Sequence, residues 1–220
     1  MPLKNVPVPL SLKAIPKAPW LQQRLQSDSA FAQQLALVWG CSDFVAEQCS
    51  ADPELFQQLV ESGDLAQSYA ADTFSTRLQQ RLAQVSSEEQ LSQQLRIFRR
   101  REMIRIVWRD FTRSAPMLET TRDATLLAES CIVGALDILH RLLCAQLGTP
   151  VNSSGEEQRL VIIAMGKMGA HELNISSDID LIFAYPDAGQ TQGGERSISN
   201  QEFFVRLGQQ LIAALDRHTA

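Results

Sequence analysis

The sequence predicts an α+β protein in which a long, mostly α-helical amino-terminal region precedes the beginning of a small sheet. From residue 20 onward, apolar side chains recur every three or four positions, the period of helices that bury one face. Two short apolar runs, 160–165 and 179–185, follow and are typical of strands covered on both faces. We therefore expect an irregular tail (1–19), a helical domain (20–148), a linker (149–158) and a second, sheet-containing domain (159–220).

The composition excludes several classes of protein. The 220 residues carry a net charge of −5, whereas general nucleic-acid binders usually show a basic balance. No apolar run approaches the roughly 18 residues of a transmembrane helix, and no signal-peptide core is present. We expect a cytoplasmic protein with no nucleic acid and no membrane among its partners. The cysteines form no C-x-x-C pair, which favours reduced, buried thiols at Cys41, Cys49, Cys131 and Cys144.

Prolines, glycines and short polar residues divide the helical region. Five of the nine prolines lie in residues 1–19, which predicts an irregular tail there. Apolar residues within 21–38 fit one helix or two abutting helices. Further helix boundaries are predicted at Asp43, at Asp52-Pro53, at Gly63, at Asp72 or Thr73, and at a capping box of Ser86 with Glu89 or Ser87 with Gln90.

The helix expected over residues 87–113 is rich in arginine. Seven arginines against one glutamate and one aspartate give residues 96–113 a local charge of +5. Four of them recur every four residues and form a ridge: Arg101, Arg105, Arg109 and Arg113. The ridge is either a solvated face, with Glu102 and Asp110 in ion pairs, or a surface that holds phosphate or an acidic patch of a protein.

Two more helices and a loop are expected toward the carboxyl end. Residues 118–147 form a long helix with a wide apolar face, and Gly148 ends it. Residues 187–199 carry three glycines and are expected to form a mobile loop. Ser199 and Glu202 then form a capping box for a last amphipathic helix.

The residues with chemical potential lie within 159–186, RLVIIAMGKMGAHELNISSDIDLIFAYP. Because side chains alternate along a strand, the carboxylates of Asp178 and Asp180 are expected on one side and Ile179 in the core. Two like charges held together favour a cation between them, and Mg²⁺ binds one or two carboxylates beside water and substrate phosphates. Gly166 and Gly169 can adopt positive φ and let a phosphate approach the backbone. The pattern indicates nucleotidyl or phosphoryl transfer with Mg²⁺ as cofactor.

The order of strand, glycine turn, short helix and D-x-D resembles the signature of the polymerase-β-like nucleotidyltransferase superfamily. Lys167 stands where that superfamily usually has a small residue, and is expected to contact phosphate in its place. The resemblance implies that Asp178 and Asp180 are catalytic metal ligands. It also implies that nucleotide or phosphate is bound by Gly166, Lys167, Gly169, Ser176 and Ser177, although the two serines fit a simple turn before the strand equally well.

The string GKMGAHELNISSDIDLIF is similar to the motif of the bifunctional glutamine synthetase adenylyltransferase/adenylyl-removing enzymes, and LRIFRRREMIRIVWRDF resembles a second segment of that family. The residues 174–177 resemble its amino-terminal, adenylyl-removing copy. Superfamily members take a third carboxylate from a later strand, but none of Glu195, Glu202 and Asp216 is expected on a strand. The resemblance therefore implies a truncated, incomplete nucleotidyltransferase domain over residues 159–220.

The implied reaction is metal-dependent, phosphorolytic removal of AMP from a tyrosine of glutamine synthetase, with addition of AMP in the full enzyme's other half. The implied partners are glutamine synthetase, ATP or ADP, phosphate and a regulatory signalling protein of nitrogen metabolism. Two alternatives stay open. In the first, the chain is a non-catalytic helical fragment that docks on glutamine synthetase or on the rest of the enzyme. In the second, it belongs to another small-substrate nucleotidyltransferase, which would leave the resemblance of the arginine-rich segment unexplained.

Overall fold

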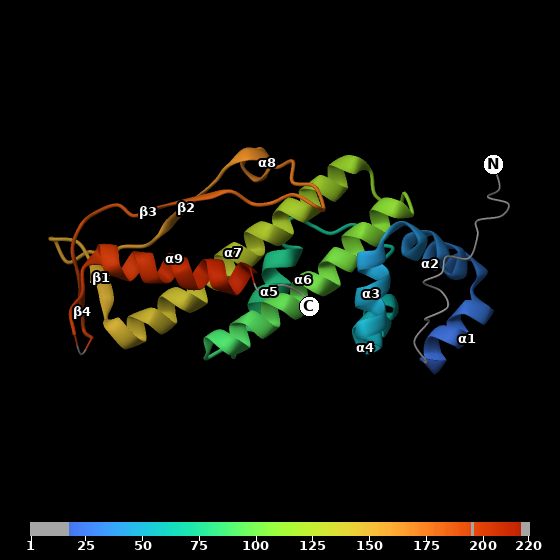
Figure 1. The fold of residues 1–220 in the computed structure, drawn as a ribbon, viewed down its shortest axis with the longest axis horizontal. Coiled ribbons are helices and arrows are strands. Elements are labelled where there is room, and N and C mark those ends of the chain that lie inside the picture. Colours follow the sequence, from blue (N-terminus) through green and yellow to red (C-terminus); the bar gives the residue numbers. More distant parts are fainter. Residues whose placement is uncertain (1–17, 195, 217–220) are drawn as a thin grey trace. The chain divides into compact units, whose positions relative to one another are not determined.

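The computed structural model describes residues 18–194 and 196–216 (Figure 1). Within these residues the chain forms nine helices and four short strands, and the helices dominate the amino-terminal part, which confirms the α+β prediction. Along the same residues, no helix combines the length and the apolar character needed to span a membrane. The tail expected over 1–19 lies almost entirely outside the described residues, and Pro19 already belongs to the first helix.

The chain divides into two compact units. The first comprises the described residues up to Tyr69 together with Arg100–Asp123, and the second comprises Ala70–Arg99 together with the described residues from Ala124 onward. Two long helices, α6 (Glu88–Phe111) and α7 (Met117–Leu147), contribute to both units. The first unit also contains α1 (Pro19–Ser27), α2 (Ser29–Cys41), α3 (Asp43–Ala51) and α4 (Pro53–Glu61).

Short polar side chains set the helix boundaries of the first unit. Oδ1 of Asp28 and Oδ1 of Asp52 each accept a hydrogen bond at 3.0 Å from the N–H three residues on, and so cap α2 and α4. The region 21–38 therefore forms two abutting helices. The prediction for α3 is wrong by one residue, because Ser42 rather than Asp43 provides its cap. Gly63, with φ of 74°, follows the end of α4 as predicted.

Aromatic side chains form the core of the first unit. The Phe31 ring stacks on Trp108 with a centroid distance of 5.5 Å, and Phe56 lies within 6.4 Å of both rings and of Trp39. All four side chains are buried. Since α2, α4 and α6 each contribute, this cluster fixes three helices against one another.

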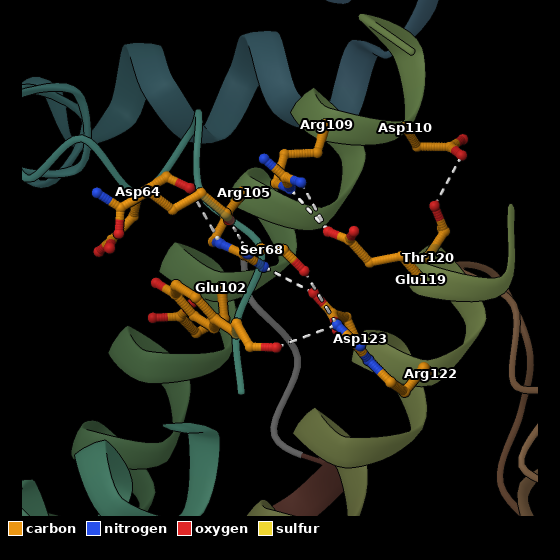
Figure 2. A network of polar contacts seen from close by, with 12 residues as sticks. Asp64, Ser68, Glu102, Arg105, Arg109, Asp110, Glu119, Thr120, Arg122 and Asp123 are labelled. Carbon is orange, nitrogen blue, oxygen red and sulfur yellow. Dashed lines mark hydrogen bonds and ion pairs between the residues drawn. The ribbon is translucent and has the colours of Figure 1, made fainter. Parts of the chain in front are cut away.

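Buried arginines hold the segment 64–69 against α6 (Figure 2). Arg105 has no exposed side-chain area, and its Nη1 donates to Asp123 Oδ2 at 2.8 Å. Its Nε donates to the backbone oxygen of Asp64 at 3.1 Å and its Nη2 to that of Gln67. The guanidinium lies 3.4 Å from the centroid of the Tyr69 ring, a cation–π geometry. We call Arg101, Arg105 and Arg109 with their acceptors the arginine cage.

The other two arginines complete the cage. Nε and Nη2 of Arg109 donate to Glu119 Oε1 at 3.0 and 2.7 Å, and Arg101 pairs with both Asp64 and Glu102. Partial burial acts to raise the pKa of Glu119, but the hydrogen bond and charge of Arg109 hold this pKa below its usual value. The cage therefore compensates buried positive charge with carboxylates.

Both hypotheses for the arginine ridge are wrong for Arg105 and Arg109. These side chains are buried and bonded to the segment 64–69 and to α7. They therefore form neither a solvated face nor a surface on which a phosphate could bind. Asp110 bonds Thr120 at 2.9 Å rather than an arginine of its own helix. Arg113 is exposed and lies beyond the end of α6, with φ of 55°.

The second unit contains two small antiparallel sheets, α5 (Thr73–Leu82), which packs on α7 at Gly134, and α9 (Asn200–Asp216), which contacts β1 and β4. Strand β1 (Thr149–Val151) pairs with β4 (Gln190–Gln192), and β2 (Val161–Ala164) pairs with β3 (Leu181–Ala184). The start of α6 has the predicted cap, since Ser87 Oγ accepts from the N–H of Gln90. The side chain of Gln90 returns to Ser86 instead of Ser87.

The described residues of 187–194 and 196–199 include a paired strand, not only the mobile loop that was expected. Thr191 is buried in β4, and the fully buried Asn200 donates from Nδ2 to the backbone oxygens of Val151 and Asp187, at 3.0 and 3.2 Å. The expected linker likewise contributes β1. This pairing was not predicted, because each strand is only three residues long and shows no clear apolar period.

Strands β2 and β3 are covered on one face, not on both as expected. Ile162, Ala164 and Leu181 pack against a cluster formed by α7, the short helix α8 (Gly166–Gly169) and the segment after it: Ala124, Ile132, Met168 and Leu173. Val161, Ile163 and Ile182 point the other way and remain 46%, 46% and 49% exposed. The continuous apolar character of both strands therefore does not mean that both faces are buried in this chain.

The cysteines follow the prediction in part. All four are free, and Cys49 and Cys131 are buried, but Cys41 is exposed. Burial raises the pKa of the Cys49 thiol, which keeps it protonated and unreactive at neutral pH.

Replacing Arg105 with alanine is expected to lower the free energy of unfolding by about 3 kcal/mol or more, because the Asp123 carboxylate and the backbone oxygens of Asp64 and Gln67 all lose this buried donor. Urea unfolding followed by circular dichroism measures this loss. The matched control is Arg96→Ala, an exposed arginine on the same helix, for which the change should stay within about 0.5 kcal/mol. Equal effects of the two substitutions would contradict a stabilising role of the cage.

His140 makes the second unit sensitive to acid. It is buried on α7 with its ring edge toward Phe203, and its Nε2 lies 3.5 Å from Glu157 Oε1. Burial, and then the charge of Arg159, lower the pKa of His140, although Glu157 and Asp137 oppose this shift. His140 is therefore neutral in the folded protein at neutral pH.

The stability of the chain is expected to decline as pH falls below the unfolded histidine pKa of 6.5, since the unfolded chain then binds a proton that folded His140 resists. The stability that neutral His140 contributes is fully present above pH 6.5. It is lost as pH falls toward the lowered pKa that His140 has in the folded chain. Urea midpoints between pH 8 and 5 measure the slope. His140→Gln should flatten this slope, and an unchanged slope would show that other groups cause it.

Candidate functional site

The acidic pair lies directly before β3. Asp178 and Asp180 are both exposed, and the backbone oxygen of Asp180 accepts a hydrogen bond at 2.9 Å from the N–H of Met165. This bond extends the β2–β3 ladder by one step beyond Ala164 and Leu181. The prediction that Ile179 enters the core is wrong. The side chain is 41% exposed because the strand begins only after the acidic pair.

The glycine turn lies next to the second carboxylate. Helix α8 (Gly166–Gly169) starts immediately after Met165, and Gly166 has the positive φ predicted for it, 55°. A Cβ atom at Gly166 would lie 3.8 Å from Asp180 Oδ2. The backbone of the turn and the Asp180 carboxylate therefore border the same space, as a phosphate between a metal and backbone N–H groups requires.

Gly169 is needed for a different reason from the one expected. It does not carry a positive φ, but a Cβ atom on it would lie 2.4 Å from the backbone oxygen of Ala164 in β2. Only a residue without a side chain permits this close approach of helix and strand. Gly169 thus sets the distance between the turn and the sheet.

Helix α7 supports the carboxyl end of the turn. The N–H groups of His171 and Glu172 return to the oxygens of Met168 and Lys167, the pattern of a Schellman motif, with His171 at the left-handed position (φ of 57°). The N–H of Leu173 donates to the buried Thr125 Oγ1 at 3.2 Å. The side chain of His171 is 69% exposed, with Nδ1 3.5 Å from Glu129 Oε1.

The remaining predicted site residues lie between the turn and the acidic pair. Nζ of Lys167 donates to Ser177 Oγ at 3.4 Å, which brings Lys167 to the segment that leads into Asp178. Ser176 and Ser177 both bond the side chain of Asn174, a residue that the sequence analysis did not single out. The feature of the sequence that could have indicated this role of Asn174 is the Asn-x-Ser-Ser spacing, which is typical of a turn closed by an asparagine side chain.

The donors present suit Mg²⁺ only in part. Asp178 and Asp180 offer the carboxylate oxygens that Mg²⁺ prefers, and a site with few protein ligands leaves positions for water and phosphate. Among the described residues no group of three or more histidine, cysteine, aspartate or glutamate side chains is placed to hold a metal. Glu202 and Asp216 lie on α9 as expected, and Glu195 lies outside the described residues.

An apolar groove of about 270 Å³ lies between β3 and α9. It is lined mainly by aromatic and aliphatic residues, including Phe183 and Tyr185, whose ring stacks on Phe204 at 4.9 Å. Few polar groups in it could orient a phosphate. The groove is therefore separate in character from the acidic pair and the glycine turn. Its signals in the sequence were the apolar run of β3 and the apolar residues of α9.

Residues 32–220 match the family model described as glutamate-ammonia ligase adenylyltransferase. The chain belongs to this family. Its glycine turn and acidic pair both lie within the matched residues, so the resemblance based on these motifs is confirmed at the level of the glutamate-ammonia ligase adenylyltransferase family.

Individual relatives give the same assignment. The bifunctional glutamine synthetase adenylyltransferase/adenylyl-removing enzyme of Pseudomonas aeruginosa is 48% identical over 201 residues, 91% of this chain and 20% of that protein. The enzymes of the same name from Nitrosococcus oceani and Shewanella oneidensis are 48% and 41% identical over 84% and 91% of the chain. The chain spans about one fifth of the length of these relatives.

Replacing Gly169 with alanine is expected to lower the free energy of unfolding by about 3 kcal/mol, because the new methyl group clashes with backbone that cannot rotate away. Urea unfolding measures the change. Gly193→Ala is the control: Gly193 has a positive φ but open space around it, so its substitution should cost only about 1 kcal/mol. A loss at Gly169 no greater than at Gly193 would contradict the steric requirement.

Proposed function

We propose that this chain holds part of the nucleotide site of an adenylyl-removing enzyme that acts on glutamine synthetase. The observation that carries the proposal is the position of Gly166: a Cβ atom added to this residue would lie 3.8 Å from Asp180 Oδ2. The chain also belongs to the adenylyltransferase family described above. The relatives' name supports glutamine synthetase as the substrate. The direction that we propose rests on the resemblance of residues 174–177 to the adenylyl-removing copy.

In the proposed reaction, an oxygen of inorganic phosphate attacks the phosphorus of AMP esterified to a tyrosine of glutamine synthetase. A new P–O bond forms to give ADP, the bond between that phosphorus and the tyrosine oxygen breaks, and the tyrosine takes up a proton. Asp178 and Asp180 would hold Mg²⁺, which neutralises charge on the phosphates when bound. The complete reaction, its protein substrate and a regulatory signalling partner belong to the longer enzyme.

The residues of this chain would bind and orient the phosphates. The N–H groups of the first turn of α8 have no partner within the helix, so the backbone from Gly166 to Met168 can donate to phosphate oxygens. Lys167 would add a positive charge beside them. Ser176 and Ser177 would complete the segment that leads into the acidic pair.

The proposed site is expected to bind ADP in the presence of Mg²⁺ and to lose this binding in the Asp178→Asn/Asp180→Asn variant, because asparagine removes the charge that holds the metal. Isothermal titration of ADP into the chain, with Mg²⁺ and with EDTA, measures the effect. The control is Asp187→Asn/Asp216→Asn, which removes two exposed carboxylates elsewhere in the same unit.

Metal-independent binding, or binding that survives in the Asp178/Asp180 variant, would contradict the proposal. A folded chain that binds no nucleotide but binds glutamine synthetase would favour the alternative, a helical docking fragment without a nucleotide site of its own. Circular dichroism of each variant separates loss of the site from loss of the fold.

A further inference from the structure

Asn174 lies at the centre of a small hydrogen-bonded turn before the acidic pair. Its Oδ1 accepts from the N–H of Ser176 at 3.2 Å and from the hydroxyl of Ser177 at 2.5 Å. Its backbone oxygen accepts from the N–H of Ser177, also at 3.2 Å. One side-chain atom of Asn174 therefore fixes both serines that precede Asp178.

The hydroxyl of Ser177 connects Asn174 to Lys167. A serine hydroxyl has a single hydrogen, and here that hydrogen is directed to Asn174 Oδ1. The oxygen of Ser177 is then oriented to accept from Lys167 Nζ, which lies 3.4 Å away. The three residues form a directed chain of hydrogen bonds from Lys167 through Ser177 to Asn174, and such chains strengthen their members.

This chain matters because a lysine side chain is flexible. Lys167 is exposed and carries four rotatable methylene groups, so an unrestrained ammonium would spread over many positions. The bond to Ser177 restrains the ammonium beside the residue that directly precedes Asp178. A lysine restrained in this way would lose less side-chain freedom when a phosphate binds beside the α8 backbone.

We propose that Asn174 is a positioning residue that orients Lys167 toward bound phosphate through the Ser177 hydroxyl. The inference rests on the proposed function, since it assigns a role within the same nucleotide site. It gives Ser177 the part of acceptor for Lys167, not of donor to phosphate. It also assigns a role to a residue that acts through the side chains of two others.

The chain of bonds can be tested without ligand. The order parameter of the Lys167 ε-methylene group, measured by NMR relaxation, is expected to fall in Asn174→Ala. It should be retained in Asn174→Asp, because aspartate keeps an acceptor oxygen in the place of Oδ1. An unchanged order parameter in Asn174→Ala would overturn the proposal whatever the ligand-binding result.

The role in binding can be tested by a double-mutant cycle with Mg²⁺ and ADP. Asn174→Ala is expected to weaken ADP binding about 3- to 10-fold, the range for loss of one hydrogen-bonded contact. In a Lys167→Met background the same change should have no further effect, because Asn174 acts only through that lysine. Asn174→Asp should restore binding to within about 3-fold at 0.3 M salt, where the added charge is screened.

The outcomes distinguish the two proposals. Failure of the unaltered chain to bind ADP contradicts the proposed function, and the NMR result then decides the role of Asn174 alone. Normal ADP binding by Asn174→Ala overturns the positioning role and leaves the nucleotide site intact. A loss of equal size with Lys167 and with Met at position 167 would show that Asn174 merely supports the fold.

Discussion

The close approach of the glycine turn to the β2–β3 sheet is the constraint on which the candidate site depends. The Met165–Asp180 hydrogen bond and the contact between Gly169 and Ala164 fix the start and the end of helix α8 against the two strands. On its other side, the turn packs on α7 through Met168 and Leu173. Three elements separated in sequence thereby determine where the backbone of Gly166 lies relative to the Asp180 carboxylate.

The arginine cage shows how a motif with an apparent binding role serves the fold. Its arginines lie at one-turn spacing, as they would on a phosphate-binding face. They are instead neutralised by acceptors on the segment 64–69 and on α7, and Arg105 also covers the Tyr69 ring. Burial and then the negative charge of Glu102 raise the pKa of Tyr69 to about 12, so its hydroxyl stays protonated beside the cage.

Local patterns in the sequence predicted much of the secondary structure. The caps at Asp52 and Ser87, the end of α7 at Gly148 and the position of the acidic pair before a strand all depend on residues within a few positions of one another. The sequence also indicated the family, because the glycine turn and D-x-D are contiguous. The sequence could not indicate contacts between residues that lie far apart along the chain and meet only after folding.

Three observations illustrate that limit. The partner of Arg105 lies 18 residues away and its backbone acceptor at Asp64 lies 41 away, distances over which no periodicity is visible. The one-sided burial of β2 and β3 depends on what covers them, not on their own apolar character. The need for glycine at position 169 arises from the carbonyl of Ala164, a contact that only the packing of helix on strand creates.

The central claim is that a metal held by the acidic pair lies beside the glycine turn. Its most direct test is to add Mn²⁺ to the isotopically labelled chain. Paramagnetic broadening of amide NMR signals reports which residues lie near the ion. Our interpretation predicts that the signals of Gly166, Asp178 and Asp180 broaden first, at Mn²⁺ concentrations that leave Arg96 unaffected. Broadening that begins elsewhere, or that leaves Gly166 sharp while Asp180 broadens, would contradict a shared site.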